Sequence, residues 1–233
     1  MSELTLLRHI EAWRFWELIG EEKKEDGHLE LALASTAHAY IWPSREPTEA
    51  SCDYCGDFYC HRTMRQNGIS MFNCMGGLYG YKSKSFALRK DLAVSDGNAI
   101  LGTVALWGRI IEHEEGYRAQ YAYPLALHGG MCWSCRKLVP LDQTHLVVTD
   151  GVFLISCPKC SYHISDFFRA EGCNWRVFFN PLNLRYALSD VWMARRHLKY
   201  LKGPGWHCDL AAYYGIPVIA EERKSPVKSV RRS

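Results

Sequence analysis

Several features that would assign a function are missing from this 233-residue chain. No apolar run approaches the ~20 residues that a membrane-spanning helix needs. The sequence also lacks a P-loop, a glycine-rich dinucleotide-binding fingerprint and the Gly-x-Ser-x-Gly elbow of hydrolases. Internal repeats and low-complexity tracts are absent too. What is left is a globular composition, with 48% hydrophobic and 23% charged residues, in a chain long enough to bury a core.

Cysteine, by contrast, is abundant, with ten residues. Many cysteines suggest a disulfide scaffold in short secreted chains, but the N-terminal residues show no apolar signal-peptide core. Cysteines in C-x2-C pairs favour metal binding and a reducing compartment. We therefore expect a cytoplasmic protein that does not enter a membrane.

Four of the cysteines form two C-x2-C pairs, which can supply the four thiolates of a closed tetrahedral zinc site. Between the pairs, segments 144–148 and 152–156 are rich in β-branched and aromatic residues, and 149–151 has turn composition. Both pairs are therefore expected at the base of one β-hairpin, the layout of a zinc ribbon. The predicted ligands of this Zn²⁺ are Cys132, Cys135, Cys157 and Cys160.

A second group of cysteines lies in a loop-rich stretch and offers five candidates for four ligand positions. A second zinc site is one interpretation, since such a stretch has few other means of ordering itself. Small buried hydrophobic side chains are the other. The preferred ligand set is Cys52, Cys55, Cys60 and Cys74, with His61 in place of Cys60 as the alternate.

The hydrophobic pattern predicts an α+β fold, with a small, mostly antiparallel β core. Its clearest signal is a hairpin at 99–124, with a polar turn at 112–116 and a second strand ending at Pro124. The first of these strands has apolar residues on both faces and should be central in its sheet. Further expected elements are a helix at 2–12, strand within 28–42, an extended piece at 78–81, a long helix at 180–201 and a short helix at 207–214 that ends at Gly215.

The block Leu106-Trp107-Gly108, followed by His113-Glu114 and Gly116-Tyr117-Arg118-Ala119, resembles small proteins of unassigned function common in actinobacteria and their phages. Those proteins close with a segment similar to 214–218. The resemblance implies strand at 13–18 and no particular activity. It also implies that 131–205 is an insertion into the core.

The resulting domain map has a β-rich core with the Cys/His cluster at 1–130 and an inserted zinc ribbon and long helix at 131–205. The core closes with a helix and strand at 206–220, and a disordered basic tail follows at 221–233. Charge is partitioned in the same way. The insert has ten Lys and Arg against five Asp and Glu, and the tail has five against two, so the rest of the chain is acidic.

This charge distribution favours a non-enzymatic, zinc-stabilised binding module of phage or bacterial origin that contacts nucleic acid or a nucleic-acid-processing protein. Solvated surface charge is the structural alternative, and a protein-interaction regulator without nucleic-acid contact is the functional one. A base could stack on Trp133. The candidate contacts with phosphate are Arg136, Lys137, Lys159, Arg195, Arg196 and Lys199, with Arg231 and Arg232 of the tail. Oligomeric state does not follow from the sequence.

A small-ligand or catalytic site is the third interpretation, located at the turn of the 99–124 hairpin. There His113 beside Glu112 and Glu114 could transfer protons, and Arg118 could bind an anion. A solvated acidic turn paired with Arg118 explains the same residues. We favour this second explanation because neither a positioned nucleophile nor an open metal site accompanies them.

Overall fold

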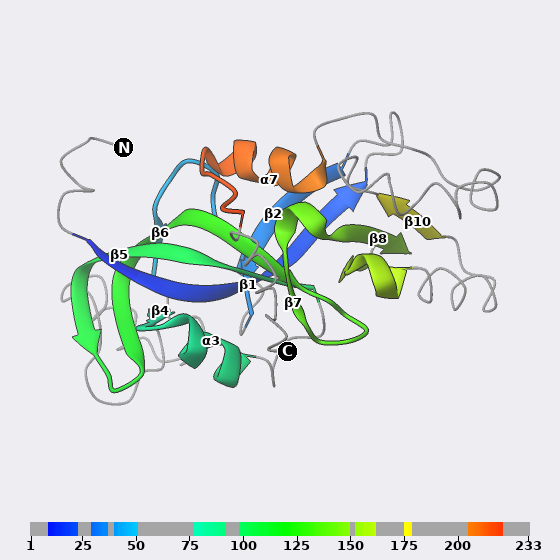
Figure 1. The fold of residues 1–233 in the computed structure, drawn as a ribbon. Coiled ribbons are helices and arrows are strands. Elements are labelled where there is room, and N and C mark those ends of the chain that lie inside the picture. Colours follow the sequence, from blue (N-terminus) through cyan, green and yellow to red (C-terminus); the bar gives the residue numbers. More distant parts are fainter. Residues whose placement is uncertain are drawn as a thin grey trace, which may run out of the picture.

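The computed structural model describes residues 9–22, 29–36, 40–50, 77–91, 98–149, 152–161, 175–178 and 205–220. It is a mostly antiparallel β structure with few short helices, as the sequence predicts (Figure 1). The elements are β1 (Ile10–Glu22), β2 (Leu29–Ser35), β3 (Thr48–Glu49), β4 (Leu78–Tyr81), α3 (Lys84–Asp91), β5 (Ala99–Glu112), β6 (Gly116–Met131), β7 (Leu138–Pro140), η1 (Leu141–Gln143), β8 (His145–Thr149), β9 (Val152–Ser156), β10 (Trp175–Phe178) and α7 (Trp206–Tyr214).

The long hairpin of β5 and β6 organises the fold and confirms the prediction at 99–124. Its second strand continues past Pro124 to Met131, so the predicted strand end is wrong. The register explains why the strand does not stop. Val104 pairs with Pro124 and Thr103 pairs with Ala126, which leaves Leu125 as an extra residue on β6. A bulge of this kind accommodates a proline, which has no N–H to give to the ladder.

Four strands close into a ring. Strand β5 pairs with both β1 and β6, and the short strand β4 pairs with both of them as well, reaching β1 through Trp13 and Tyr81. Strand β2 extends the sheet from β1, and β3 and β7 extend it from β6. β5 is therefore central, as its two apolar faces indicate.

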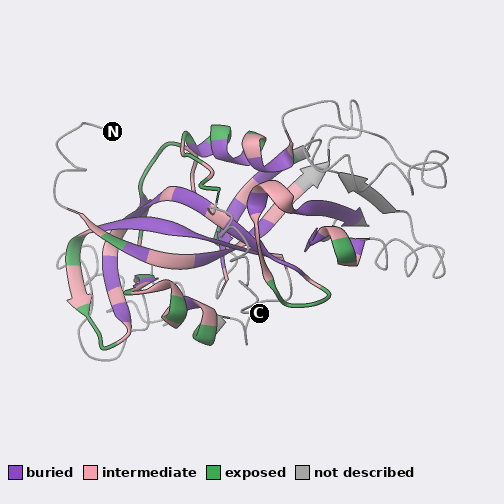
Figure 2. Ribbon diagram, in the orientation of Figure 1, coloured by how far each residue is buried: buried purple, intermediate pink, exposed green. Residues whose placement is uncertain are grey.

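The ring shares the main core cluster with β2, the β8–β9 hairpin and α7, and its strands have long buried stretches in Figure 2. Ile100, Val104 and Leu106 belong to this main cluster, whereas Leu101 joins a second cluster with Ala87 of α3, as the alternation along β5 predicts. The interior is tight at β4. A Cβ on Gly80 would lie 2.6 Å from the Cβ of Ala12, so only glycine lets β4 approach β1.

The ribbon strands β8 and β9 pair with each other as predicted, with Thr149 opposite Val152, and β10 adds a third strand beside β8. The apolar side chains of this hairpin share the ring's core cluster, through Leu146, Val148, Phe153 and Ile155. The contact with the ring is close, since a Cβ on Gly130 of β6 would lie 2.6 Å from Cγ2 of Ile155. Ribbon and ring therefore bury one continuous core.

The closing helix α7 is also as predicted, and it ends at Gly215 in the left-handed conformation (φ 66°). Its last residue, Tyr214, is fully buried. The Tyr214 hydroxyl accepts a hydrogen bond from the N–H of Leu33 and donates one to the carbonyl of Trp42, both 2.9 Å. After the helix, Val218 bridges to Leu127 of β6. The C-terminal part of the described chain thus returns to the ring.

The remaining expectations have different outcomes. The helix at 2–12 is wrong where the structure describes it, because Ile10–Ala12 belong to β1 and pair with β5; the strand at 13–18 implied by the resemblance is confirmed. Helix α3 and strand β10 were not predicted. The long helix at 180–201 and the tail at 221–233 lie outside the described residues. Within the described part of the chain, every helix is too short or too polar to cross a bilayer.

Candidate metal centre

The first knuckle is a tight loop between β6 and β7. The N–H of Cys132 donates to the carbonyl of Lys137 (2.9 Å), and the N–H of Arg136 donates back to the carbonyl of Cys132 (2.9 Å). Arg136 has a positive φ of 56°, which lets the chain reverse directly after Cys135. The N–H of Trp133 donates to the carbonyl of Ile155 (2.8 Å), and this bond ties the loop to β9.

The second knuckle follows β9 and is a single helical turn at 158–161. The N–H groups of Cys160 and Ser161 both donate to the carbonyl of Cys157, at 3.0 Å each. Pro158 stands at the first position of this turn, where its missing N–H costs nothing. The turn directs the side chains of Cys157 and Cys160 to the same side.

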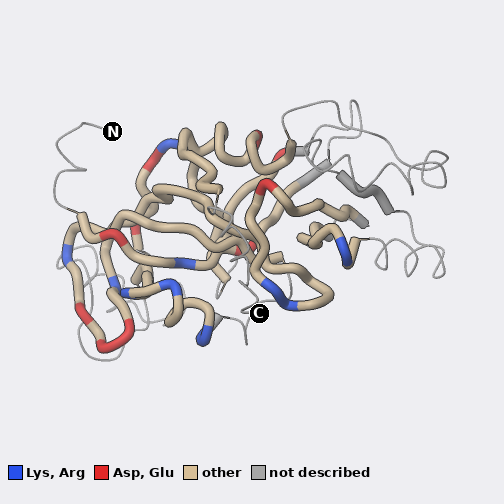
Figure 3. The backbone as a smooth tube through the Cα atoms, viewed as in Figure 1, with Lys and Arg blue, Asp and Glu red and all other residues tan. Residues whose placement is uncertain are grey.

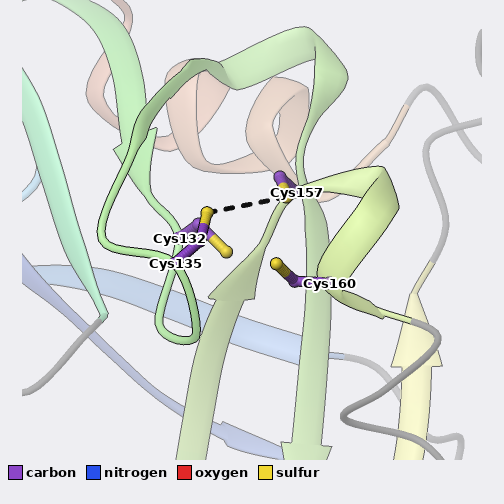
Figure 4. A group of neighbouring side chains, drawn as sticks. All are labelled: Cys132, Cys135, Cys157 and Cys160. Carbon is purple, nitrogen blue, oxygen red and sulfur yellow. Dashed lines mark hydrogen bonds between the residues drawn. The ribbon is translucent and has the colours of Figure 1, made fainter.

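The two knuckles bring the four predicted sulfur atoms together from separate loops (Figure 4). All four lie within 4.8 Å of one another, and the sulfurs of Cys135 and Cys157 are 3.9 Å apart. Zinc–sulfur bonds of ~2.3 Å in a tetrahedron place neighbouring sulfurs about 3.8 Å apart. The cluster therefore fits a tetrahedral ion bound by four thiolates, and it could hold a metal ion such as Zn²⁺. Cys132 and Cys157 are buried, Cys160 is partly buried and Cys135 is exposed.

The thiols of the cluster are electrostatically linked. Burial tends to raise the pKa of Cys132, but N–H groups of Cys135, Cys157 and Ser134 that point at its sulfur lower that pKa to about 7. Burial raises the pKa of Cys157, and burial together with hydrogen bonding to Cys157 raises that of Cys160 to about 12. A negative charge on Cys132 opposes ionisation of both. A divalent cation is what would let all four sulfurs ionise together, with release of protons on binding.

Each knuckle also contains basic residues. We use the name basic rim for Arg136 and Lys137 of the first knuckle and Lys159 of the second, which are all exposed. In Figure 3 the two knuckles have basic segments, drawn in blue. Trp133 is half-buried beside them. Four thiolates with one bound Zn²⁺ would have two negative charges in excess, which these three cations would help to balance.

The turn between β5 and β6, the other candidate site, does not include the four cysteines. His113 is exposed there and its ring stacks on Tyr79, with 5.8 Å between centroids. The carboxylates of Glu112 and Glu115 form ion pairs with Lys82 (2.6 Å) and Lys90 (3.2 Å), and Glu114 is exposed. Arg118 is buried, with its aliphatic stem in the space where a side chain on Gly77 would stand. His113 therefore packs on β4, and the stem of Arg118 fills the space beside Gly77.

The other predicted site residues lie outside the described residues. They are the second cysteine group, Cys52, Cys55, Cys60, His61 and Cys74, and the basic residues Arg195, Arg196, Lys199, Arg231 and Arg232. The anchoring bond of Trp133 and the left-handed Arg136 were not foreseen. Only the C-x2-C spacing signals such a knuckle, and it does not say which backbone groups close it.

Comparisons of the chain with models of protein families, with curated proteins and with solved structures each give no match. The resemblance to actinobacterial and phage proteins therefore stays an expectation, and the described four-cysteine centre carries the functional argument.

Proposed function

We propose that this protein is a non-enzymatic binding module, that Zn²⁺ bound by Cys132, Cys135, Cys157 and Cys160 shapes its ribbon, and that the basic rim contacts nucleic acid. The observation that carries the proposal is the four-sulfur cluster with its exposed cations. A closed site with four protein ligands leaves no position for substrate, which is typical of structural zinc. The metal would supply conformational order, and the protein's own side chains would supply binding.

The exposure of the first knuckle supports a contact surface there. Residues 134–137 are exposed, although Cys132, two residues before them, is buried and donates its N–H to the carbonyl of Lys137. The chain thus presents two cations on a loop whose backbone is fixed at both ends. Lysine and arginine on such a preorganised surface can neutralise phosphates and release counterions. The half-buried Trp133 adds an aromatic ring on which an unpaired base could stack.

The rim has a competing role, because its charges also offset the excess negative charge of a zinc tetrathiolate. Two measurements distinguish the roles. If the rim only compensates charge, its removal weakens zinc binding and leaves the zinc-loaded protein's affinity for nucleic acid unchanged. If the rim contacts phosphate, removal weakens nucleic-acid binding in protein that still holds its full zinc.

The test is a filter-binding titration of zinc-loaded protein against single-stranded DNA, RNA and duplex DNA over a range of salt concentrations. A plot of log K against log salt has a negative slope, to which each phosphate contact contributes ~0.7–0.9 in magnitude. For the triple variant Arg136→Ala, Lys137→Ala and Lys159→Ala we expect this slope to become shallower by about 2–3. A matched triple variant, Arg89→Ala, Lys90→Ala and Arg109→Ala, removes three exposed cations elsewhere and should leave the slope nearly unchanged. No binding at low salt by wild-type protein with a full zinc complement would overturn the nucleic-acid part of the proposal.

A protein-interaction role without nucleic acid is the second candidate, and exposed apolar residues favour it. Tyr40, Ile41 and Tyr213 are 41%, 55% and 48% exposed. They belong to neighbouring segments, because the hydroxyl of Ser44 donates to the carbonyl of Tyr213. A pull-down that fails with Tyr40→Ser and Ile41→Ser but persists in the rim variant would support this candidate over the first.

A further inference from the structure

The four cysteines of the centre differ in how far each residue is exposed. Cys135 is an exposed residue, whereas Cys132 and Cys157 are buried and Cys160 is partly buried. The sulfur of Cys135 is also 3.9 Å from that of the buried Cys157, across the gap between the two knuckles. A disulfide bond needs a sulfur–sulfur distance of ~2.05 Å, so these two atoms must approach by about 2 Å.

Backbone hydrogen bonds hold both knuckles, and of the two cysteines in the first knuckle Cys135 is the one farther from the strands. Cys157 directly precedes a hydrogen-bonded helical turn, and its carbonyl accepts two N–H groups. The backbone of Cys132 is held by bonds to Lys137 and Arg136, and Trp133 is held to β9. Cys135 lies between these anchors, in the exposed part of the first knuckle.

From this arrangement we propose that the centre is also a site of reversible oxidation by peroxides, in which Cys135 reacts first and Cys157 resolves it. The proposal uses the same cysteines as the zinc site but does not depend on nucleic-acid binding. Accessible thiolates beside a second thiol are the cysteines that peroxides oxidise reversibly.

The chemistry has two steps. The Cys135 thiolate attacks one oxygen of hydrogen peroxide, the O–O bond breaks, and a sulfenic acid and hydroxide form. The Cys157 thiolate then attacks the Cys135 sulfur, the S–O bond breaks, hydroxide leaves and the disulfide forms. The two thiolates lose two electrons in total, and the two hydroxides formed from peroxide take up two protons from solvent to become water. The disulfide removes two of the four thiolates that would hold Zn²⁺, so a bound ion would dissociate.

The new bond would join the knuckles in place of the metal. Cys135 precedes the β8–β9 hairpin and Cys157 follows it, so a disulfide between them spans the same base that the zinc does. The oxidised ribbon should therefore keep its β8–β9 pairing while losing metal. Reduction in the presence of Zn²⁺ should restore the original centre.

The experiment treats the full-length, zinc-loaded protein with a small excess of hydrogen peroxide and traps intermediates with dimedone. Zinc release is followed with a chromogenic chelator, and disulfides are located by non-reducing peptide mapping. We expect dimedone labelling at Cys135 on the order of tenfold above Cys132 or Cys157, and a Cys135–Cys157 cross-link that thiol reductant removes. The control Cys208→Ser alters a partly buried cysteine outside the centre and should react like wild type.

Cross-links formed mainly within one knuckle, Cys132 to Cys135 or Cys157 to Cys160, would overturn the assignment. So would retention of all four free thiols in the centre under excess peroxide. In Cys135→Ser the cross-link and the early dimedone signal should both disappear. If that variant does not fold, the wild-type peptide map decides the question by itself.

Discussion

Two regions of the molecule are stabilised in different ways: the ring of β1, β4, β5 and β6, and the zinc ribbon. The ring closes its hydrogen-bond ladder on itself and buries large side chains such as Trp16, Phe15 and Leu18. The ribbon is a small sheet with loops at its base, where four thiols converge. Small units rarely bury enough apolar surface to stay folded, and a metal compensates for this. A metal ion bound by these thiols would therefore act where backbone pairing ends.

The two regions are nevertheless joined, because Leu146 and Ile155 of the ribbon belong to the ring's core cluster. A fully independent ribbon would unfold completely without metal. With metal bound, this ribbon would divide into a docked inner half, the β8–β9 strands, and an outer half that depends on the metal, the knuckles.

Zinc removal should produce the largest effect. Apparent binding free energies of structural zinc are about 10–16 kcal/mol, and this stabilisation acts on the knuckles. We expect chelation under reducing conditions to abolish amide-exchange protection at 132–137 and 157–161 while 99–112 in β5 stay protected. Hydrogen-exchange mass spectrometry measures both regions in one sample. Uniform loss across β5, or unchanged knuckles, would contradict the division.

Truncation of Trp16 should come next, and it should affect both regions. Trp16 is fully buried and packs edge-on against Trp42, with 5.4 Å between centroids. Trp16→Ala should cost about 3–5 kcal/mol of unfolding free energy, since the cavity lies in the shared core. The matched variant Trp107→Ala removes a half-buried tryptophan that stacks on Tyr121, and should cost about 1 kcal/mol. Equal losses in urea titrations would mean that the core is not where we place it.

Removing the hydroxyl of Tyr214 should detach the closing helix from β2. Tyr214→Phe leaves the N–H of Leu33 and the carbonyl of Trp42 buried without this partner, at a cost of about 3 kcal/mol. The neighbouring variant Tyr213→Phe changes an exposed ring and should have no measurable effect. Thermal unfolding of the pair tests the contact, and similar melting temperatures would rule it out.

Acid should weaken the ribbon through His145 on β8. Burial lowers the pKa of His145 to about 4, below its ordinary value of 6.5. The unfolded chain therefore binds more protons between pH 4 and 6.5, and stability falls as pH falls through this window. Between pH 7 and 5 the loss due to His145 is about 2 kcal/mol. His145→Gln should have a correspondingly shallower pH dependence than wild type, with metal content matched. Parallel curves would show that His145 is not the titrating group.

The sequence predicted those elements whose signal is local. The two hairpins, the extended piece at Leu78–Tyr81 and the helix ending at Gly215 each follow from alternation or turn residues within a short window. The C-x2-C spacing likewise placed all four sulfurs of the described centre, because a knuckle needs only a few consecutive residues.

Pairing between strands far apart in the sequence determined the parts of the fold that were not predicted. The i+3 spacing of Leu4, Leu7 and Ile10 indicates a helix, but pairing with β5 makes Ile10 part of a strand. Among the residues of α3 whose burial is described, Ala87 alone is fully buried, so the helix lacks an apolar stripe. Its local signal was Ser83, whose hydroxyl accepts a hydrogen bond from the N–H of Phe86 in the manner of an N-cap. No local pattern could show that β4 closes the ring.

The central claim is that Cys132, Cys135, Cys157 and Cys160 hold a zinc ion, and native mass spectrometry of freshly purified, reduced protein tests it most directly. The double variant Cys132→Ser and Cys157→Ser should carry one zinc fewer per chain than wild type, while Cys208→Ser should keep the wild-type count. A double variant with the same metal content as wild type, or a wild-type chain without zinc, would contradict the account.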